Sequence, residues 1–116
     1  MEFGMKRIIA SVRVVAVMKK LYTGAPVTVA TISSELKLSQ SYVEQIVSKL
    51  GKAKIVRGQK GPGGGYHLCK PESETSVAEV IRAVTIIPHS SIFDPVLVAL
   101  DSVLVSQLSD AKISTP

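Results

Sequence analysis

One stretch, Ser39–Cys69, sets most of the expected fold. It reads SQSYVEQIVSKLGKAKIVRGQKGPGGGYHLC. Apolar residues recur at helical spacing in its first half and predict a helix over about Gln40–Ala53. These residues are Val43, Ile46, Val47 and Leu50. The second half predicts a hairpin, with strands near Ile55–Arg57 and Tyr66–Cys69 around a glycine-rich tip. A helix followed directly by a basic two-stranded ribbon is the layout of a winged-helix DNA reader.

The tip, Gln59–Gly65, contains three consecutive glycines, which would be costly in a helix or a central strand. We expect them to permit positive φ and a close approach of the backbone to something outside the protein. A cradle for nucleotide phosphates is the alternative. No G-x-x-x-x-G-K-[ST] pattern is present and the glycines do not lie between a strand and a helix, so that alternative is rejected.

Two helices are expected before this stretch, over Lys6–Tyr22 and Val29–Leu36. Thr28 is a suitable N-cap for the second of them. A short turn then leads into the helix that begins near Gln40, which gives a helix-turn-helix pattern. Either Ser39 or Ser41 can cap that helix, and in the second case Ser41-x-x-Glu44 would form a capping box.

The C-terminal part predicts a helix over Val77–Val84, begun by a capping box at Ser76-x-x-Glu79, then a loop over Thr85–Phe93. A last helix is expected over about Pro95–Leu108. It is apolar on more than one stripe, which favours pairing with the same helix of a second copy over simple burial in the monomer. The residues expected at this dimer interface are Leu97, Leu100, Leu104 and Leu108.

Charge is divided unevenly along the chain. Residues 1–70 carry twelve Lys and Arg against three Asp and Glu, a balance of +9, whereas residues 71–116 carry two against six, a balance of −4. A basic N-terminal part indicates a polyanion as partner, although a solvated basic surface would look the same.

The composition of the chain excludes several classes of protein and several kinds of site. No apolar run reaches about 18 residues, so no membrane span is expected, and the N-terminus lacks the order of a secretory signal, so a cytoplasmic location is expected. The single cysteine excludes an internal disulfide and any all-cysteine metal site, so no cofactor or metal is predicted. A Cys69 pair with His67 or His89 is the only nucleophile candidate, and a lone cysteine on a wing strand is usually a small buried apolar residue, so an enzyme is not predicted.

The polar face of the helix beginning near Gln40 suits the major groove, where amides and hydroxyls pair with base edges and lysines contact phosphates. Glu44 would be repelled by phosphate, so it either accepts a hydrogen bond from a cytosine amino group or serves only in the capping box. The tip is expected along the minor groove, with Lys60 as its charge. The expected DNA-binding residues are Thr28, Ser39, Gln40, Ser41, Tyr42, Glu44, Gln45, Lys49, Lys60, Gly61, Gly63, Gly64 and Gly65.

Four segments carry a resemblance to a known family. They are Ser41–Gln45, Leu50–Val56, Lys60–Tyr66 and Val77–Val84. Together and in this order they resemble the Rrf-two family of bacterial winged-helix transcription regulators (the IscR, NsrR and CymR type). The resemblance implies a homodimer on an operator, with Ser39–Gln45 in the major groove and the wing in the minor groove. The family's arginine before the wing glycines is Lys60 here, which keeps the charge but loses the fork geometry.

The chain departs from the iron–sulfur members of that family, which carry three cysteines in the loop before the dimerisation helix. Here that loop, Thr85–Phe93, has no cysteine. The resemblance therefore implies a regulator without a cluster, whose signal is a partner protein, a small ligand or the thiol of Cys69. The sequence does not choose among these three.

The expected fold is mostly α with a small β-wing. It comprises a winged helix-turn-helix domain over residues 1–84, a short loop without cluster ligands over 85–94, and a dimerisation helix with a tail over 95–116. The expected function is that of a cytoplasmic, sequence-specific, homodimeric regulator of transcription, in the manner of a repressor, with double-stranded DNA as partner. The alternative is a winged-helix module that binds a partner enzyme and has weak or no DNA binding.

Overall fold

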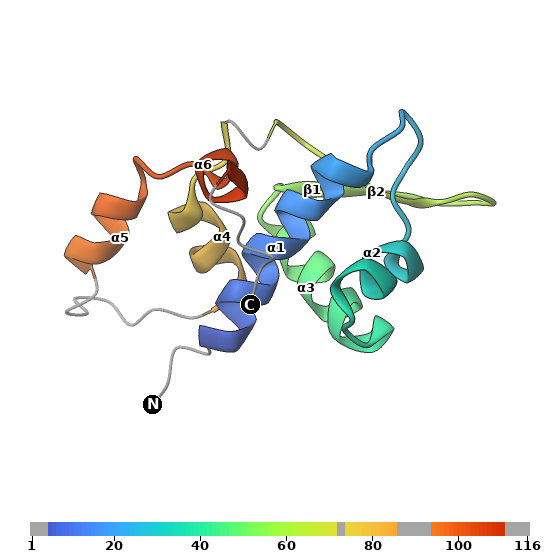
Figure 1. The fold of residues 1–116 in the computed structure, drawn as a ribbon, viewed down its shortest axis with the longest axis horizontal. Helices are drawn as coiled ribbons and strands as arrows, with labels where there is room; N and C mark the ends of the chain where they lie inside the picture. Colours follow the sequence, from blue (N-terminus) through green and yellow to red (C-terminus); the bar gives the residue numbers. More distant parts are fainter. Residues whose placement is uncertain (1–4, 72–73, 86–93, 111–116) are drawn as a thin grey trace.

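The computed structural model describes residues 5–71, 74–85 and 94–110 of the chain. Its described part measures 45 × 27 × 27 Å along its principal axes (Figure 1). In chain order the elements are α1 (Met5–Leu21), α2 (Val29–Leu36), α3 (Gln40–Lys52), β1 (Val56–Gln59), β2 (Gly65–Leu68), α4 (Val77–Val84), α5 (Asp94–Leu100) and α6 (Val105–Asp110). The expectation of a mostly α fold with a small β-wing is confirmed. Among the described helices, none is long and apolar enough to cross a membrane.

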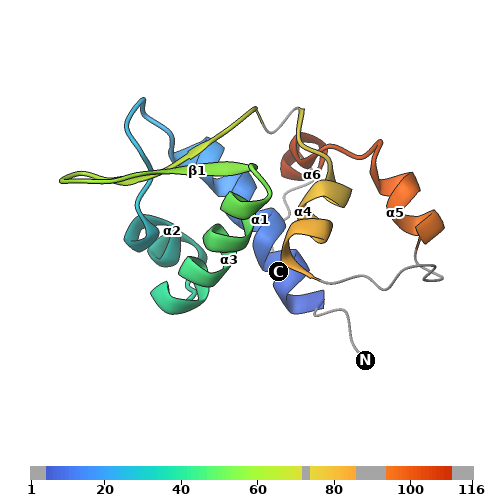
Figure 2. The ribbon, with the colours of Figure 1, turned by 180° about the vertical axis from the view of Figure 1, so that it is seen from behind.

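Helix α1 runs through the middle of the molecule and packs against α2, α4 and α6 (Figures 1 and 2). Its side chains Val14 and Val15 are fully buried, and Met18 is 1% exposed. Helix α3 packs against α2, α4 and β1 through the apolar face predicted for it, from Val43 to Leu50. The core is therefore aliphatic, and its main support is one central helix.

Strands β1 and β2 form an antiparallel ribbon in which Val56 pairs with Leu68 and Gln59 with Gly65. A residue before α2 joins this ribbon. The N–H of Val27 donates to the carbonyl oxygen of Tyr66 at 2.9 Å, and the N–H of Tyr66 donates to that of Val27 at 2.8 Å. This isolated antiparallel bridge ties the base of the wing to the start of the helix-turn-helix.

The tip glycines have two different roles. Gly61 and Gly63 have φ of 100° and 73°, as expected of a turn that only glycine adopts easily. Gly64 and Gly65 instead permit close packing, since a Cβ on Gly65 would lie 2.5 Å from the carbonyl oxygen of Val27 and one on Gly64 would overlap the carbonyl of Gln59. The expected positive φ is wrong for these two, and an approach of their backbone to something outside the protein stays a prediction.

The hydrogen bonds at the starts of α3 and α4 show which predicted N-cap interactions are present. The hydroxyl of Ser39 accepts from the N–H of Tyr42 at 3.1 Å, so Ser39 is the N-cap of α3 and the proposed capping box between Ser41 and Glu44 is wrong. The capping box at α4 is confirmed. The N–H of Glu79 donates to the hydroxyl of Ser76 at 3.1 Å, and the N–H of Ser76 donates to the carboxylate of Glu79 at 2.8 Å.

The expected single helix over Pro95–Leu108 is wrong, because α5 ends at Leu100 and α6 begins at Val105. The chain between them pairs with the residues before α4. The N–H of Val77 donates to the carbonyl oxygen of Val103 at 2.8 Å, and the N–H of Val105 donates to that of Thr75 at 2.9 Å. The side chain of Val105 is fully buried, so this segment shares the core of the preceding domain.

The residues expected at a dimer interface face mostly inward. Leu97 is 6% exposed, Leu100 and Leu108 are partly buried against the core, and Leu104 is half-buried. The large apolar side chains that α5 exposes are Val96, at 48%, and Val98, at 67%. Dimerisation itself stays a prediction. Of the predicted loop over Thr85–Phe93, only Thr85 lies within the described residues.

Replacement of Gly65 by alanine tests the close packing at the Val27–Tyr66 bridge. The new methyl would collide with backbone, which cannot rotate away, so we expect the free energy of unfolding to fall by about 1–3 kcal/mol. Urea denaturation measures it. Gly58→Ala, which adds the same methyl in β1 at an ordinary 3.5 Å from the ring of Tyr66, is the control and should change stability by less than about 0.5 kcal/mol. Equal stability of both variants would contradict the account.

Glu79 should make the stability depend on pH. Burial raises the pKa of its carboxyl, but the hydrogen bonds from Lys70 and the N–H of Ser76, with the charge of Lys70, outweigh burial and leave the pKa below its ordinary value. A lowered pKa stabilises the fold above the unfolded-state pKa, and that contribution is lost as the pH falls from about 5 toward about 3. In urea melts, Glu79→Gln should lose less stability over this range than the parent. The exposed Glu74→Gln, matched in charge, should follow the parent, and identical curves for all three proteins would refute the role of Glu79.

Candidate nucleic-acid interface

The wing and helix α3 lie at the same end of the molecule. In Figure 1 the ribbon of β1 and β2 projects beyond the body on the side where α2 and α3 lie, and α5 is at the opposite end. Figure 2 shows the same arrangement from behind. The two elements predicted to contact DNA, α3 and the wing, are therefore neighbours in space.

The predicted recognition residues of α3 lie on its outward face. The structure exposes Ser39, Gln40, Ser41, Glu44, Gln45 and Lys49, with Ser48 and Lys52 on the same side. Tyr42 differs, since it is half-buried and packs against the core. The surface is thus a continuous polar strip of hydroxyl, amide and charged groups, with Tyr42 supporting it from beneath.

The hydroxyl groups of Thr28 and Ser39 are engaged in capping. The hydroxyl of Thr28 accepts from the N–H of Thr31 at 3.0 Å and lies 2.8 Å from the hydroxyl of Thr31. Ser39 leaves the first N–H groups of α3, those of Gln40 and Ser41, without an intrahelical acceptor. Those N–H groups and the positive end of the helix dipole suit a phosphate oxygen. Thr28 and Ser39 therefore contribute to this surface through the backbone that they order.

Glu44 is exposed in the second turn of α3, and its carboxylate has no ion-pair or hydrogen-bond partner in the described part of the chain. The capping explanation for this residue is removed, because Ser39 caps the helix. A carboxylate left free among cationic and polar neighbours is then available to an external donor.

The wing tip presents Lys60, Gly61, Pro62 and Gly63 to solvent, while Gly64 and Gly65 are half-buried. Nothing lies within 4 Å of where a Cβ would stand on Gly61 or Gly63. Lys60 forms no ion pair among the described residues. The tip is consequently narrow and open, with one free cation beside it.

The exposed charges around α3 and the wing are mostly positive. The exposed cations from α2 to the wing are Lys37, Lys49, Lys52, Lys54, Arg57 and Lys60. Glu35 is occupied by an ion pair with Lys20 of α1, with 2.8 Å between Nζ and Oε2. Glu44 is then the one carboxylate on this surface that the structure leaves unpaired, among the described residues. Such a surface attracts a polyanion over distances limited by salt screening.

Val27 and Tyr66 are important residues that the sequence reasoning missed. Their backbone bridge fixes the wing relative to α2 and α3. A single bridging residue gives no strand periodicity. The only available signal was a β-branched residue after Pro26, with a glycine directly before Tyr66.

Cys69 lies at the base of the wing as predicted, and its thiol is exposed and free. Its N–H donates to the carbonyl oxygen of Ile55 at 2.9 Å, which continues the ribbon. Its expected burial as a small apolar residue is therefore wrong, and a redox role stays a prediction. His89, the other candidate partner, lies outside the described residues, and His67 is 8% exposed with its Nε2 2.8 Å from Oε1 of Gln59.

The sequence model of the Rrf2 (Rrf-two) family, described as an iron-dependent transcriptional regulator, matches residues 5–95. Among the residues that the structure describes, no group of three His, Cys, Asp or Glu could hold a metal ion, and the 116 residues contain one cysteine. An iron–sulfur cluster takes several thiolates, so the donor set here does not fit one.

Curated relatives match about half of the chain. IscR of Photorhabdus laumondii is 52% identical over 59 residues, which are 51% of this chain and 36% of the relative. IscR of Escherichia coli O1:K1 is 49% identical over the same length, with the same coverage. The matched region therefore spans about a third of the length of these relatives, which are named as HTH-type transcriptional regulators.

Solved structures match most of the chain. CymR of Bacillus subtilis, titled the global cysteine regulator, has a TM-score of 0.73 at 21% identity and covers 90% of this chain and 94% of its own. The oxidized form of Staphylococcus aureus CymR has a TM-score of 0.73 at 25% identity, with coverage of 95% and 97%. These matches agree with the expected winged-helix fold. On the match over residues 5–95, the chain belongs to the Rrf2 family of transcriptional regulators.

Proposed function

We propose that this chain is a sequence-specific DNA-binding regulator that acts in the cytoplasm as a repressor, binds its operator as a homodimer and uses no iron–sulfur cluster. The observation that carries the proposal is the placement of the outward face of α3 and the wing tip at one end of the molecule, on a surface of mostly unpaired cations. The major groove of DNA admits one α-helix, and a neighbouring ribbon then reaches the adjacent minor groove.

The start of α3 is proposed to read bases. Gln40, Ser41 and Gln45 are exposed and carry groups that pair with base edges, while Lys49 is placed further along the helix for phosphate. Glu44 is proposed to accept a hydrogen bond from a cytosine amino group. Its freedom from any capping role supports this, because an unpaired carboxylate near phosphate otherwise only weakens binding.

The wing is proposed to enter the minor groove with its tip. Lys60, next to Gly61, supplies a charge, and the absence of side chains at Gly61 and Gly63 lets the backbone come close to the sugar–phosphate walls. Gly64 and Gly65 support this indirectly, since they permit the packing that holds the tip in place. Lys contacts phosphate as a point charge without bidentate geometry, so this contact should be insensitive to sequence.

A second copy is proposed to pack against α5. Val96 and Val98 are exposed apolar residues on that helix, at the end of the molecule away from the wing. A two-fold arrangement would present two copies of α3 to DNA, and the half-sites should then lie about one helical turn apart, roughly 34–36 Å. Analytical ultracentrifugation of Val98→Glu against Gln107→Glu, which is also exposed and adds the same charge, tests this interface.

A protein-interaction module that acts through a partner enzyme is the second candidate. It is disfavoured by the surplus of cations on the exposed faces of α3 and the wing, which an average protein surface would not require. A gel shift with the DNA upstream of the protein's own gene, against a scrambled duplex of equal length, separates the two candidates. Specific retardation supports the regulator, and no difference between the duplexes supports the interaction module.

DNA affinity should fall steeply with salt, because the cations of both α3 helices and both wings displace counterions from phosphate. With two or three phosphate contacts per protomer, a plot of the logarithm of the association constant against the logarithm of the salt concentration should have a slope of about −4 to −5. Fluorescence anisotropy at several NaCl concentrations measures it. A slope near zero would contradict the assigned surface.

Glu44→Ala and Lys60→Ala should have different effects. Loss of the Glu44 carboxylate should relax base preference at one operator position, by about 1–3 kcal/mol of discrimination, with little change on unrelated sequences. Loss of the Lys60 charge should weaken binding to all sequences alike. Anisotropy on the operator and on single-base variants distinguishes the two, and uniform loss for both variants would remove Glu44 from the base-reading residues.

A further inference from the structure

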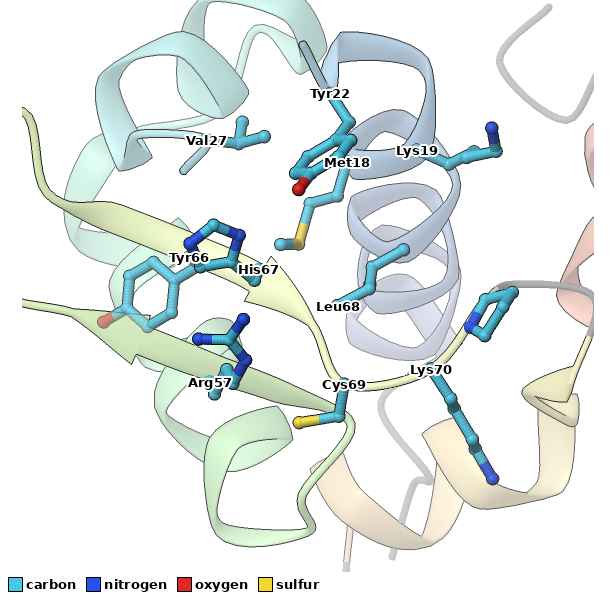
Figure 3. A pocket seen from close by; sticks show the side chains of 11 residues that line it. Met18, Lys19, Tyr22, Val27, Arg57, Tyr66, His67, Leu68, Cys69 and Lys70 are labelled. Atoms are coloured by element: carbon cyan, nitrogen blue, oxygen red, sulfur yellow. The ribbon is translucent and has the colours of Figure 1, made fainter. Parts of the chain in front are cut away.

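A cavity of about 390 Å³ lies between the last turns of α1, the segment before α2 and the strands of the wing (Figure 3). We call it the α1–wing cavity. Its volume falls in the range of small-molecule sites, about 300–1,000 Å³. None of its lining residues belongs to α3, so it is distinct from the surface proposed to read bases.

The walls of the α1–wing cavity are largely apolar. Met18 from α1 and Val27 from the segment before α2 are 1% and 5% exposed, and Leu68 of β2 forms another side. The rings of Tyr22 and Tyr66 also line it. Such walls accept an aliphatic or aromatic body without a cost in lost hydrogen bonds.

On the polar side of the cavity, the ring of His67 is held by two contacts. His67 is 8% exposed, and its Nε2 lies 2.8 Å from Oε1 of Gln59, across the ribbon. The ring of Tyr22 meets that of His67 edge to face, with centroids 6.0 Å apart. These contacts place His67 as part of the wall, with its hydrogen-bonding capacity partly used.

The charged residues of the cavity are all cations. Lys19 and Arg57 come from α1 and β1, Lys70 follows β2, and no Asp or Glu lines the cavity. Lys70 is already paired with Glu79 at 2.7 Å. Lys19 and Arg57 have no ion pair or hydrogen bond of their side chains within the described ranges, and Figure 3 shows the guanidinium of Arg57 turned toward His67.

We propose that the α1–wing cavity binds a small organic monocarboxylate with an apolar body. The carboxylate lies against the guanidinium of Arg57, which supplies a bidentate donor, and the body packs against Met18, Val27 and Leu68. Unpaired cations beside buried apolar walls are the complementary surface for such a molecule.

Occupancy of this cavity should reduce DNA affinity, a consequence that rests on the proposed DNA-binding function. Val27 and Tyr66, whose backbones join the wing to the helix-turn-helix, both line the cavity. A bound anion also cancels positive charge at the base of the wing. By linkage, a ligand that weakens DNA binding is itself weakened by DNA to the same extent.

The test uses 4-phenylbutyrate as probe and 4-phenylbutanol as its neutral match. The ¹⁵N-labelled full chain is titrated and followed by ¹H–¹⁵N correlation spectra, including the Nε–H of Arg57. We expect saturable shifts confined to the end of α1, to Val27 and Arg57, and to residues 66–70. The alcohol should bind about fivefold more weakly or worse, since it lacks the ion pair.

Two variants test whether Arg57 is the cation that binds the carboxylate of the probe. Arg57→Gln should weaken 4-phenylbutyrate about fivefold, because an exposed ion pair has a modest effect. Lys6→Gln, which removes one exposed positive charge at the other end of α1, should leave the affinity unchanged. The site is refuted if no local shifts occur at 10 mM probe, if acid and alcohol bind equally, or if both variants behave alike.

The effect on DNA is measured separately, with the operator and matched ionic strength. Saturating 4-phenylbutyrate should weaken operator binding about fivefold or more, and 4-phenylbutanol should not. If the probe binds at the cavity and operator affinity does not change, the proposed effect of the cavity on DNA binding is wrong. If no duplex is bound even without probe, the proposed function fails while the spectra still decide the site. If DNA alone shifts the same amides and excludes the probe completely, the cations face a DNA phosphate and the small-molecule assignment is wrong.

Discussion

The structure depends on a two-hydrogen-bond contact between Val27 and Tyr66. An isolated two-stranded ribbon is only marginally stable in water, so the wing needs a third backbone segment to hold it in one orientation. Val27 supplies it from the segment directly before α2, and the absence of a side chain at Gly65 lets the two backbones meet. Because Val27 also precedes the N-cap of α2, the same contact sets the wing relative to the helix-turn-helix. The geometry of the proposed DNA surface therefore depends on this backbone bridge together with the packing of α3 against β1 and of α1 against β2.

This contact explains why glycines that look alike in sequence act differently. Gly61 and Gly63 have positive φ and shape the exposed turn, whereas Gly64 and Gly65 make room for neighbouring backbone. The same bridge places Val27 and Tyr66 against α1, and the α1–wing cavity forms beside it. A molecule in that cavity would touch the residues that orient the wing. A regulator without cluster cysteines thus has a physical route from a small ligand to DNA, provided that the proposed site and function both hold.

What could be predicted from the sequence was set by local interactions. The bounds of α2 and α4, the apolar face of α3 and the capping box at Ser76 follow from spacing and capping chemistry within a few residues. What could not be predicted depends on distant partners. The break between α5 and α6 arises because Val103 and Val105 pair with the residues before α4, which overrides an apolar pattern that favours one long helix. The choice of Ser39 over Ser41 as N-cap had no local signal, and it removed the capping alternative for Glu44, whose role in recognition is a proposal.

The central claim is that the bridge holds α3 and the wing in one fixed arrangement that fits adjacent grooves. Footprinting of the parent protein on its operator tests it most directly, with dimethyl sulfate reporting guanine N7 in the major groove and hydroxyl radicals reporting the minor groove. We expect, in each half-site, major-groove protection by α3 beside a minor-groove protection at a constant offset, and Lys60→Ala should diminish only the second. Major-groove protection with no flanking minor-groove protection would contradict it, since the wing would then not be held where the bridge places it.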